Sequence, residues 1–259
     1  MNMMKSALLQ LSALRLALVQ KPVKKRTFLS AKRYLQDRQA FLAAGGSIAL
    51  DRPMLQDLSD QAGSASGHYF HQDLLVATKI NQAHPQKHVD VGSRIDGFVA
   101  HVAAFREIEV FDIRPLNPTA HPRIKFIQGD LMSDNGAPSD YCDSLSCLHA
   151  LEHFGLGRYG DPIDPDGHRK GFRNLTRMLK DGGILYISFP IGSSGTHFNA
   201  HRVFDPTEIL EWGKEDFQLI DYHYVDDQGS LQKCVTPSAT PQLHYGCGIY
   251  TLRKTKRDA

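Results

Sequence analysis

The sequence is poor in cysteine and has no hydrophobic run long enough to cross a bilayer. Its four cysteines form no C-x-x-C pair, and a chain of this length needs no disulfides, so we expect reduced thiols in a cytoplasm. The apolar run at 7–19 is interrupted by Gln10, Ser12 and Arg15 and falls short of the roughly 20 residues of a spanning helix. A basic segment follows in place of a cleavage site, which excludes a secretory signal.

The chain also lacks a large net charge, which is only +2, but the charge is unevenly distributed. Residues 1–38 hold nine Lys and Arg against one acid, so residues 39–259 carry six more acids than bases. The basic segment 1–38, called the basic head below, favours contact with an anionic surface. The acidic remainder of the chain, the body, offers no basic face for a nucleic-acid duplex, so nucleic acid is not an expected partner. Peripheral membrane contact through residues 1–38 is one interpretation; a helix that packs on the body or moves freely is the favoured one.

Length and composition suit one α/β domain with an extension, because 259 residues with 41% apolar content can bury a sizeable core. The small, polar segment QAGSASG at 61–67 predicts the boundary. We therefore expect a basic helical extension over 1–66, with a short amphipathic helix at 28–42, and a catalytic domain over 67–259.

Strand-like and helix-like segments alternate through the second part of the chain. Strands are predicted at 88–92, 107–112, 123–128, 143–148 and 183–190, and helices at 68–80, 96–106 and 167–180. This alternation predicts a mostly parallel sheet with helices on both faces. Two more strand segments, 217–225 and 247–254, follow without a helix between them and predict an antiparallel hairpin at the sheet edge.

The segment HVDVGSRIDGF at 88–98 predicts a nucleotide cradle. A β-branched run ends there at Asp90, and Gly92 lets the backbone approach a ligand beside the next helix. Asp112 ends the following strand, twenty residues after Gly92, where a carboxylate can accept both hydroxyls of a ribose. The sequence has no G-x-G-x-x-G here, which argues against NAD because a pyrophosphate needs the second glycine.

These motifs resemble those of the class I S-adenosylmethionine-dependent methyltransferases, over roughly residues 67–254. More narrowly, HYFHQDLLVA, VDVGSRIDGFVAH, FDIRP and LEHFGLGRYGD are similar to a domain family of unknown function numbered 268. The resemblance implies a Rossmann-like fold, with a mostly parallel seven-stranded sheet that ends in an antiparallel hairpin, and S-adenosyl-L-methionine as cofactor. The methionine part of that cofactor carries no phosphate, so a turn that lacks the second glycine of G-x-G-x-x-G suits it.

The resemblance also implies a set of cofactor-binding residues. Asp90 and Gly92 match the loop that faces the methionine part, Asp112 the ribose-binding acid, and Asp130 the acid that contacts the adenine amino group. The turn departs from the family, because Arg94 occupies a position where a small residue is usual, but its guanidinium can pair with the cofactor carboxylate. Each acid could instead only cap a turn. The full set is Asp90, Gly92, Ser93, Arg94, Gly97, Asp112, Asp130, Leu131 and Ser146.

The segment HALEHFGLGRYGD at 149–161 holds the candidate catalytic groups. Methyl transfer to a hydroxyl requires alignment and a base that takes the proton. His153 is the first candidate base, oriented by Glu152 or Asp161, and His149 is the second. An anchoring role for His153, through a bond to the backbone, is the alternative. The order H-A-L-E-H differs from H-E-x-x-H, so no metal is expected.

The segment GSSGTHFNAHRVFDP at 192–206 predicts a lid over a polar acceptor. Its candidate substrate-binding residues are His197, Asn199, His201 and Arg202, the last suited to a carboxylate or phosphate. The same groups could equally tie a long loop to the sheet.

Together these features predict a cytoplasmic enzyme, located at the inner face of a membrane if its basic head binds lipid. We expect it to methylate a hydroxyl of a small polar or carbohydrate acceptor. The rival hypothesis is a non-catalytic module that binds an adenosyl ligand and is recruited to membranes or partners by its basic N-terminus.

Overall fold

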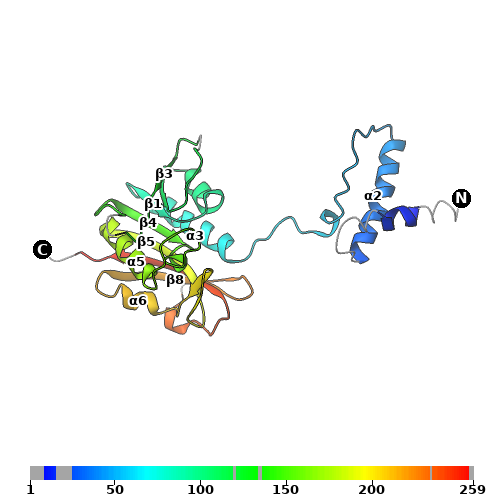
Figure 1. Ribbon diagram of the computed structural model, residues 1–259. Helices are drawn as coiled ribbons and strands as arrows, with labels where there is room; N and C mark the ends of the chain where they lie inside the picture. The colour runs from blue at the N-terminus through cyan, green and yellow to red at the C-terminus, as the bar shows by residue number, and fades with distance from the viewer. Residues whose placement is uncertain (1–8, 16–24, 119–120, 134–135, 234, 257–259) are drawn as a thin grey trace. The chain divides into compact units, whose positions relative to one another are not determined.

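The computed structural model describes residues 9–15, 25–118, 121–133, 136–233 and 235–256, and the chain divides into two compact units, Met1–Ser64 and Ala65–Ala259 (Figure 1). In the first unit, α2 spans Lys25–Ala43 and is slightly longer than the predicted helix. A small core of Ala13, Ala31 and Leu55 holds this unit together. Among the described helices, none is long and apolar enough to cross a membrane, and part of the 7–19 run lies outside the described residues.

The second unit is built on one eight-stranded sheet with the order β3-β2-β1-β4-β5-β10-β8-β9. Its strands are β1 (His88–Val91), β2 (Ile108–Asp112), β3 (Ile124–Gln128), β4 (Cys142–Leu148), β5 (Leu179–Ile191), β8 (Phe217–Val225), β9 (Leu231–Gln232) and β10 (Gly246–Lys254). The first five strands are parallel, and β10 pairs antiparallel with both β5 and β8. The predicted parallel sheet and C-terminal hairpin are therefore confirmed. The two-residue β9 is an eighth strand that the sequence did not predict.

Helices cover both faces of this sheet, as the alternating pattern predicted. On one face, α3 (His68–Ala83) and α4 (Ala100–Ala103) pack on a cluster that includes Ile80, Val102 and Ile249. On the other face, α5 (Gly167–Met178) and α6 (Glu208–Trp212) pack on a cluster that includes Leu145 and Leu175.

Three local predictions differ from the structure. The helix expected at 96–106 is a π-helical turn, Ile95–Val99, followed by α4, because Gly97 adopts a non-helical backbone conformation. β5 begins earlier than predicted, since Leu179 already pairs with Cys142 of β4. The predicted lid contains a separate two-stranded sheet, β6 (Gly195–His197) with β7 (His201–Val203).

Candidate active site

A cavity lies beyond the carboxyl ends of β1, β2 and β4, where the strand order reverses between β1 and β4. This is the place at which open α/β sheets bind ligands. The space free of protein atoms here, open solvent included, is about 510 Å³. Of the predicted cofactor residues it brings together Gly92, Asp112, Asp130 and Leu131.

Gly92 follows β1 with a φ of 74°, in the left-handed region that glycine adopts at no steric cost. A Cβ at this position would lie 2.7 Å from the Cβ of Ala150, which is closer than two carbon atoms can approach. The backbone therefore turns here only because no side chain is present. This close approach forms the floor of the cavity where β1 ends.

Asp112 ends β2 as predicted, but its carboxylate is already occupied. Arg114 donates to it from Nε (3.0 Å, to Oδ1) and from Nη2 (2.6 Å, to Oδ2), and the Arg114 backbone N–H donates to Oδ1. The Asp112 side chain is 10% exposed and that of Arg114 is 45% exposed, so the arginine covers the acid on the solvent side. A ribose bound at Asp112 would have to displace part of this contact.

Asp130 follows β3, where it stabilises a turn and also lines the cavity. Its carboxylate accepts a hydrogen bond from the Met132 backbone N–H at 2.8 Å, which is the turn-stabilising role. It also lines the cavity, together with the buried Leu131. Asn174 of α5 donates to the Leu131 carbonyl at 2.7 Å and fixes the segment against the other helix layer.

Asp90, Ser93 and Ser146 form a buried hydrogen-bonded group beneath the cavity rather than part of its lining. Both hydroxyls donate to Asp90 Oδ1, at 2.7 Å from Ser93 and 2.5 Å from Ser146. Burial raises the pKa of Asp90 to about 7, although these hydrogen bonds lower it. The structure therefore places these three residues as supports of the Gly92 turn, not in contact with a ligand in the cavity.

Arg94 and Gly97 also depart from their expected positions. Arg94 makes an exposed ion pair with Asp96 at 3.1 Å and lies over the ring of Tyr69, where it lines a second cavity. Gly97 lines neither this cavity nor the first, and lies in a shallow groove beside Asp73.

The second cavity adjoins the first and is more polar. The two cavities share Gly92, Arg114, His149, His153 and Tyr159. The other residues of the second cavity are His68, Tyr69, Arg94, Leu148, Glu152, Arg158, His201 and Tyr245. Because the shared groups separate the two spaces, a molecule in one cavity would meet a molecule in the other at His149 and His153.

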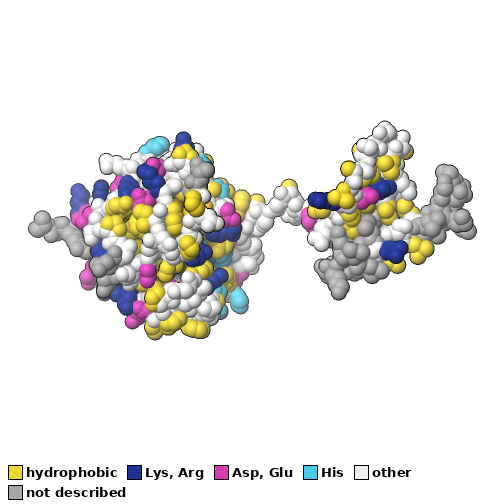
Figure 2. Space-filling view, turned by 45° about the horizontal axis from the view of Figure 1, so that its top comes forward, with side chains coloured by type: hydrophobic (Ala, Val, Ile, Leu, Met, Phe, Trp, Pro, Cys, Tyr) yellow, Lys and Arg dark blue, Asp and Glu magenta, His cyan; other side chains and the backbone are white. Residues whose placement is uncertain are grey.

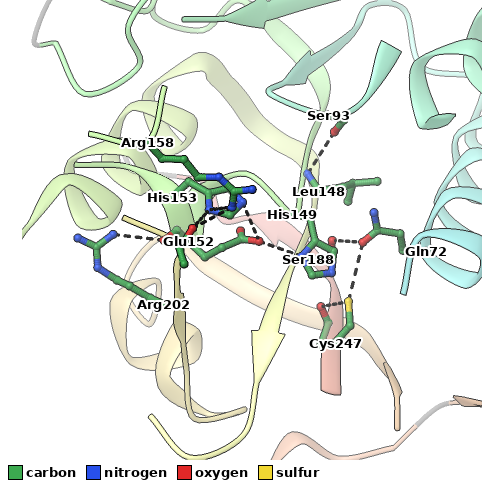
Figure 3. A network of polar contacts seen from close by, with 12 residues as sticks. Gln72, Ser93, Leu148, His149, Glu152, His153, Arg158, Ser188, Arg202 and Cys247 are labelled. Carbon is green, nitrogen blue, oxygen red and sulfur yellow. Dashed lines mark hydrogen bonds and ion pairs between the residues drawn. The ribbon is translucent and has the colours of Figure 1, made fainter. Parts of the chain in front are cut away.

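Glu152 pairs with His149 and not primarily with His153, contrary to the predicted arrangement (Figure 3). Its Oε1 lies 2.8 Å from His149 Nδ1 and 3.6 Å from His153 Nε2. Burial opposes charge at His149, but the neighbouring Cys247 sulfur and the Glu152 carboxylate raise its pKa well above the usual value. The pKa of Glu152 is lowered by His149 in spite of burial.

His153 is anchored through its Nδ1, which donates to the Ala200 carbonyl at 2.7 Å. His153 lines both cavities, its Nε2 lies 3.6 Å from Glu152 Oε1, and burial lowers the pKa of its imidazole. The predicted backbone-anchoring role is therefore present, and it leaves the second nitrogen free of the proton that Nδ1 holds. Asp161 does not orient His153, because it accepts the backbone N–H groups of Gly155, Gly157 and Tyr159.

The predicted lid contributes one residue to the second cavity, His201. His197 is exposed on β6 and stacks on His201, with ring centroids 4.9 Å apart. Asn199 lies in the turn between β6 and β7 with a φ of 62°. Neither His197 nor Asn199 lines one of the two cavities.

Arg202 does not face an acceptor, which corrects the sequence-based prediction. It is only 4% exposed, and its guanidinium donates to the Phe154 carbonyl at 2.6 Å and the Pro165 carbonyl at 3.2 Å. Longer contacts reach the carbonyls of Glu152 and Asp164. The arginine therefore ties the 152–165 loop to β7.

Sequence reasoning missed several lining residues. Arg158 and Tyr159 belong to the LEHFGLGRYGD motif, and His68 and Tyr69 to HYFHQDLLVA, so these motifs contained a signal for them. Tyr245 had no comparable signal, because only the return of β10 beside β5 brings it to the cavity.

Comparisons with known proteins agree with this fold. The sequence model of a family described as "Caenorhabditis protein of unknown function, DUF268" matches residues 125–224. No curated protein matches the sequence. Among solved structures, the [4+2]-cyclase SpnF is 15% identical, with a TM-score of 0.52 over 90% of this chain and 97% of that chain.

Two further structures are similar. A chain in the complex between the Haloferax volcanii Trm112 methyltransferase activator and the putative methyltransferase has a TM-score of 0.50 and 12% identity, over 74% of this chain and 92% of its own. The N-methyltransferase NodS from Bradyrhizobium japonicum WM9, in complex with S-adenosyl-L-homocysteine, has a TM-score of 0.49 and 13% identity, over 86% and 99%. At such identities the likeness concerns the fold alone, and the match to SpnF confirms the predicted Rossmann-like α/β architecture.

Proposed function

We propose that this protein is an S-adenosylmethionine-dependent methyltransferase that acts on a hydroxyl of a small polar acceptor. The observation that carries the proposal is the pair of adjoining cavities, which share the wall formed by His149 and His153. One cavity has acids at two successive strand ends, and the other is lined by polar and cationic groups. Such a division suits a nucleoside cofactor on one side and its acceptor on the other.

The residues of the first cavity fit an adenosyl ligand. Asp112 is placed to accept ribose hydroxyls, Asp130 to accept the adenine amino group, and Gly92 to admit the ligand close to the backbone. Phe111 and Leu131 supply apolar walls for the base. When bound, the cofactor supplies an activated methyl group on a sulfonium.

His153 acts as the general base in this proposal. Its Nδ1 proton is held by the Ala200 carbonyl, so Nε2 is the nitrogen that can accept a proton, and His153 lines both cavities. An acceptor hydroxyl in the second cavity gives its proton to this nitrogen as the oxygen attacks the methyl carbon. Glu152, 3.6 Å from His153 Nε2, favours the imidazolium that results.

The lining of the second cavity favours an acceptor that carries negative charge, such as a sugar with a carboxylate or phosphate group. Three arginines line it: Arg94, Arg114 and Arg158. Arg94 and Arg114 pair with Asp96 and Asp112, whereas Arg158 has no carboxylate partner among the described residues and donates to the Ala200 carbonyl. Arg158 thus takes the anion-binding role that the sequence suggested for Arg202.

The test is release of S-adenosylhomocysteine from S-adenosylmethionine in the presence of pooled anionic and neutral sugars. We expect turnover by the wild type, loss of at least about 100-fold in His153→Ala, and unchanged calorimetric binding of S-adenosylhomocysteine by that variant. His121→Ala, which removes an exposed imidazole that lines neither cavity, is the control and retains activity. Equal loss in both variants would contradict a base role for His153.

The second candidate function is the non-catalytic adenosyl-binding module, favoured by the contact of Arg114 with Asp112. In this case the basic N-terminal unit recruits the protein to membranes or partners. Binding of S-adenosylhomocysteine without turnover on any pool, together with co-sedimentation of the full chain with anionic vesicles, supports the module. A thermal-shift screen that shows tighter binding of pyridine nucleotides would contradict both candidates.

A further inference from the structure

Three potential metal ligands from distant parts of the sequence meet at the inner wall of the second cavity. His68 begins α3, His149 follows β4, and Cys247 is near the start of β10. One ligand atom from each lies within 4.8 Å of the others. No sequence motif indicated this cluster, because its members are separated by 81 and 98 positions.

His149 is held as a metal-binding imidazole usually is. Its Nδ1 is 2.8 Å from Glu152 Oε1, so the carboxylate fixes the ring and directs the other nitrogen away from it. That nitrogen, Nε2, is buried and has no hydrogen-bond partner among the described residues. His149 also has a φ of 50°, a backbone conformation that non-glycine residues adopt rarely and mostly at functional sites.

The side chains of Cys247 and His68 lie close enough to His149 to bind the same metal ion. Cys247 is fully buried and is a free thiol, and its sulfur makes long contacts of 3.8 Å to Gln72 Oε1 and 3.7 Å to the Gly248 carbonyl. The ring of His68 is nearly parallel to that of His149, with centroids 5.1 Å apart. His68 is partly exposed at the first residue of α3, where its ring also stacks on that of Tyr245, with centroids 5.4 Å apart.

We propose that His68, His149 and Cys247 form a binding site for a transition-metal ion, and that this ion is zinc. Two imidazoles and a thiolate are a ligand set that zinc accepts, and three protein ligands leave one position open. Tetrahedral zinc places neighbouring ligand atoms roughly 3.3–3.7 Å apart. Because the three ligand atoms all lie within 4.8 Å of one another, each separation has to close by no more than about 1.5 Å when the ion binds.

The open position faces the second cavity, because His68 and His149 both line it. An oxygen of the acceptor can therefore occupy the fourth position, where the ion would orient it and favour its deprotonated form. Only this last role rests on the proposed function. The site itself does not, since its ligands are defined without reference to methyl transfer.

The experiment is equilibrium dialysis of the full-length protein against buffered zinc, with metal content measured by mass spectrometry. We expect one zinc per chain, and at least a tenfold loss of affinity in His68→Ala and in Cys247→Ser. Cobalt is the spectroscopic probe: the wild type is expected to show a thiolate-to-cobalt charge-transfer band that Cys247→Ser lacks. Neither readout needs an acceptor or turnover, so failure here is distinct from failure of the proposed function.

Two controls separate this site from general thiol or histidine binding. Cys142→Ser removes another buried thiol, in β4, and His197→Ala removes an exposed imidazole, and both are expected to bind zinc as the wild type does. Thermal unfolding without metal identifies a variant that fails to fold. If Cys247→Ser fails to fold, the His68→Ala result carries the test, because His68 is only partly buried whereas Cys247 is fully buried. Substoichiometric zinc in the wild type, or unchanged affinity in His68→Ala, would overturn the proposal.

Discussion

Arg114 reaches back two residues and binds both carboxylate oxygens of Asp112, at 3.0 Å from Nε and 2.6 Å from Nη2. The acid proposed to bind a ribose is thus covered by a partly exposed arginine. Because exposed ion pairs contribute only about 0–1 kcal/mol, a ligand can displace this contact at small cost. Arg114→Ala is therefore expected to bind S-adenosylhomocysteine up to about fivefold more tightly than the wild type, by calorimetry.

A weaker affinity in Arg114→Ala would mean instead that the arginine itself contacts the ligand. Arg123→Ala is a suitable control, since this arginine bonds the carbonyl of Ala104, before β2 begins, and lies away from the cavity.

Asp112→Ala tests the ribose contact directly. Hydrogen bonds to a charged group contribute about 1.5–3 kcal/mol each, so the loss of the carboxylate is expected to weaken S-adenosylhomocysteine binding at least tenfold. Glu107→Ala is the matched control, because it removes an exposed acid beside the opposite end of the same strand, where Glu107 pairs with Lys125. Equal affinities for the two variants would show that Asp112 does not bind the ligand.

Gly92→Ala is expected to destabilise the protein by about 2–4 kcal/mol and to abolish ligand binding, as measured by urea unfolding and calorimetry. The added Cβ would meet the Ala150 Cβ at 2.7 Å as well as require a positive φ. Gly182→Ala separates the two effects. Gly182 has a similar φ of 78° but no atom within 4 Å of the added Cβ, so it is expected to cost only about 1 kcal/mol. Similar losses in both variants would exclude crowding as the cause.

The buried Asp90 predicts a pH dependence of stability. Burial raises the pKa of Asp90 to about 7 in the folded protein, whereas in the unfolded chain it is about 3.9. The folded state therefore binds the proton more tightly, and the free energy of unfolding falls as pH rises from about 4 to 7, by up to about 4 kcal/mol, then levels off. Asp90→Asn removes this contribution. Denaturant titrations across this range should show the wild type losing stability relative to the variant, and parallel profiles would contradict the assignment.

Arg202→Met tests the structural role of this arginine. The substitution leaves the Phe154 and Pro165 carbonyls without their donor, and we expect it to lower the free energy of unfolding by about 2–4 kcal/mol. His197→Ala, in the adjacent strand β6 and exposed, should stay within about 0.5 kcal/mol of the wild type. A stable Arg202→Met with weakened acceptor binding would instead restore the sequence-based prediction.

The sequence by itself determined the architecture, because strand and helix periodicity, turn residues and strand-end acids are local features. The parallel strands, the C-terminal hairpin and the cavity position beside Gly92 and Asp112 were predictable from them. The sequence also singled out Gly92 as the residue that lets the backbone approach a ligand, but the clash of an added Cβ with Ala150 is visible only in the structure.

Only the tertiary structure decided which polar groups face each other. Asp90 and Arg202 are chemically suited to ligands, but packing buries them against Ser146 and against backbone carbonyls. The meeting of His68, His149 and Cys247 depends on α3, β4 and β10 folding around one point. Side-chain partnerships across such distances in the chain have no periodicity in sequence, because they are set by the register and packing of whole elements rather than by local spacing.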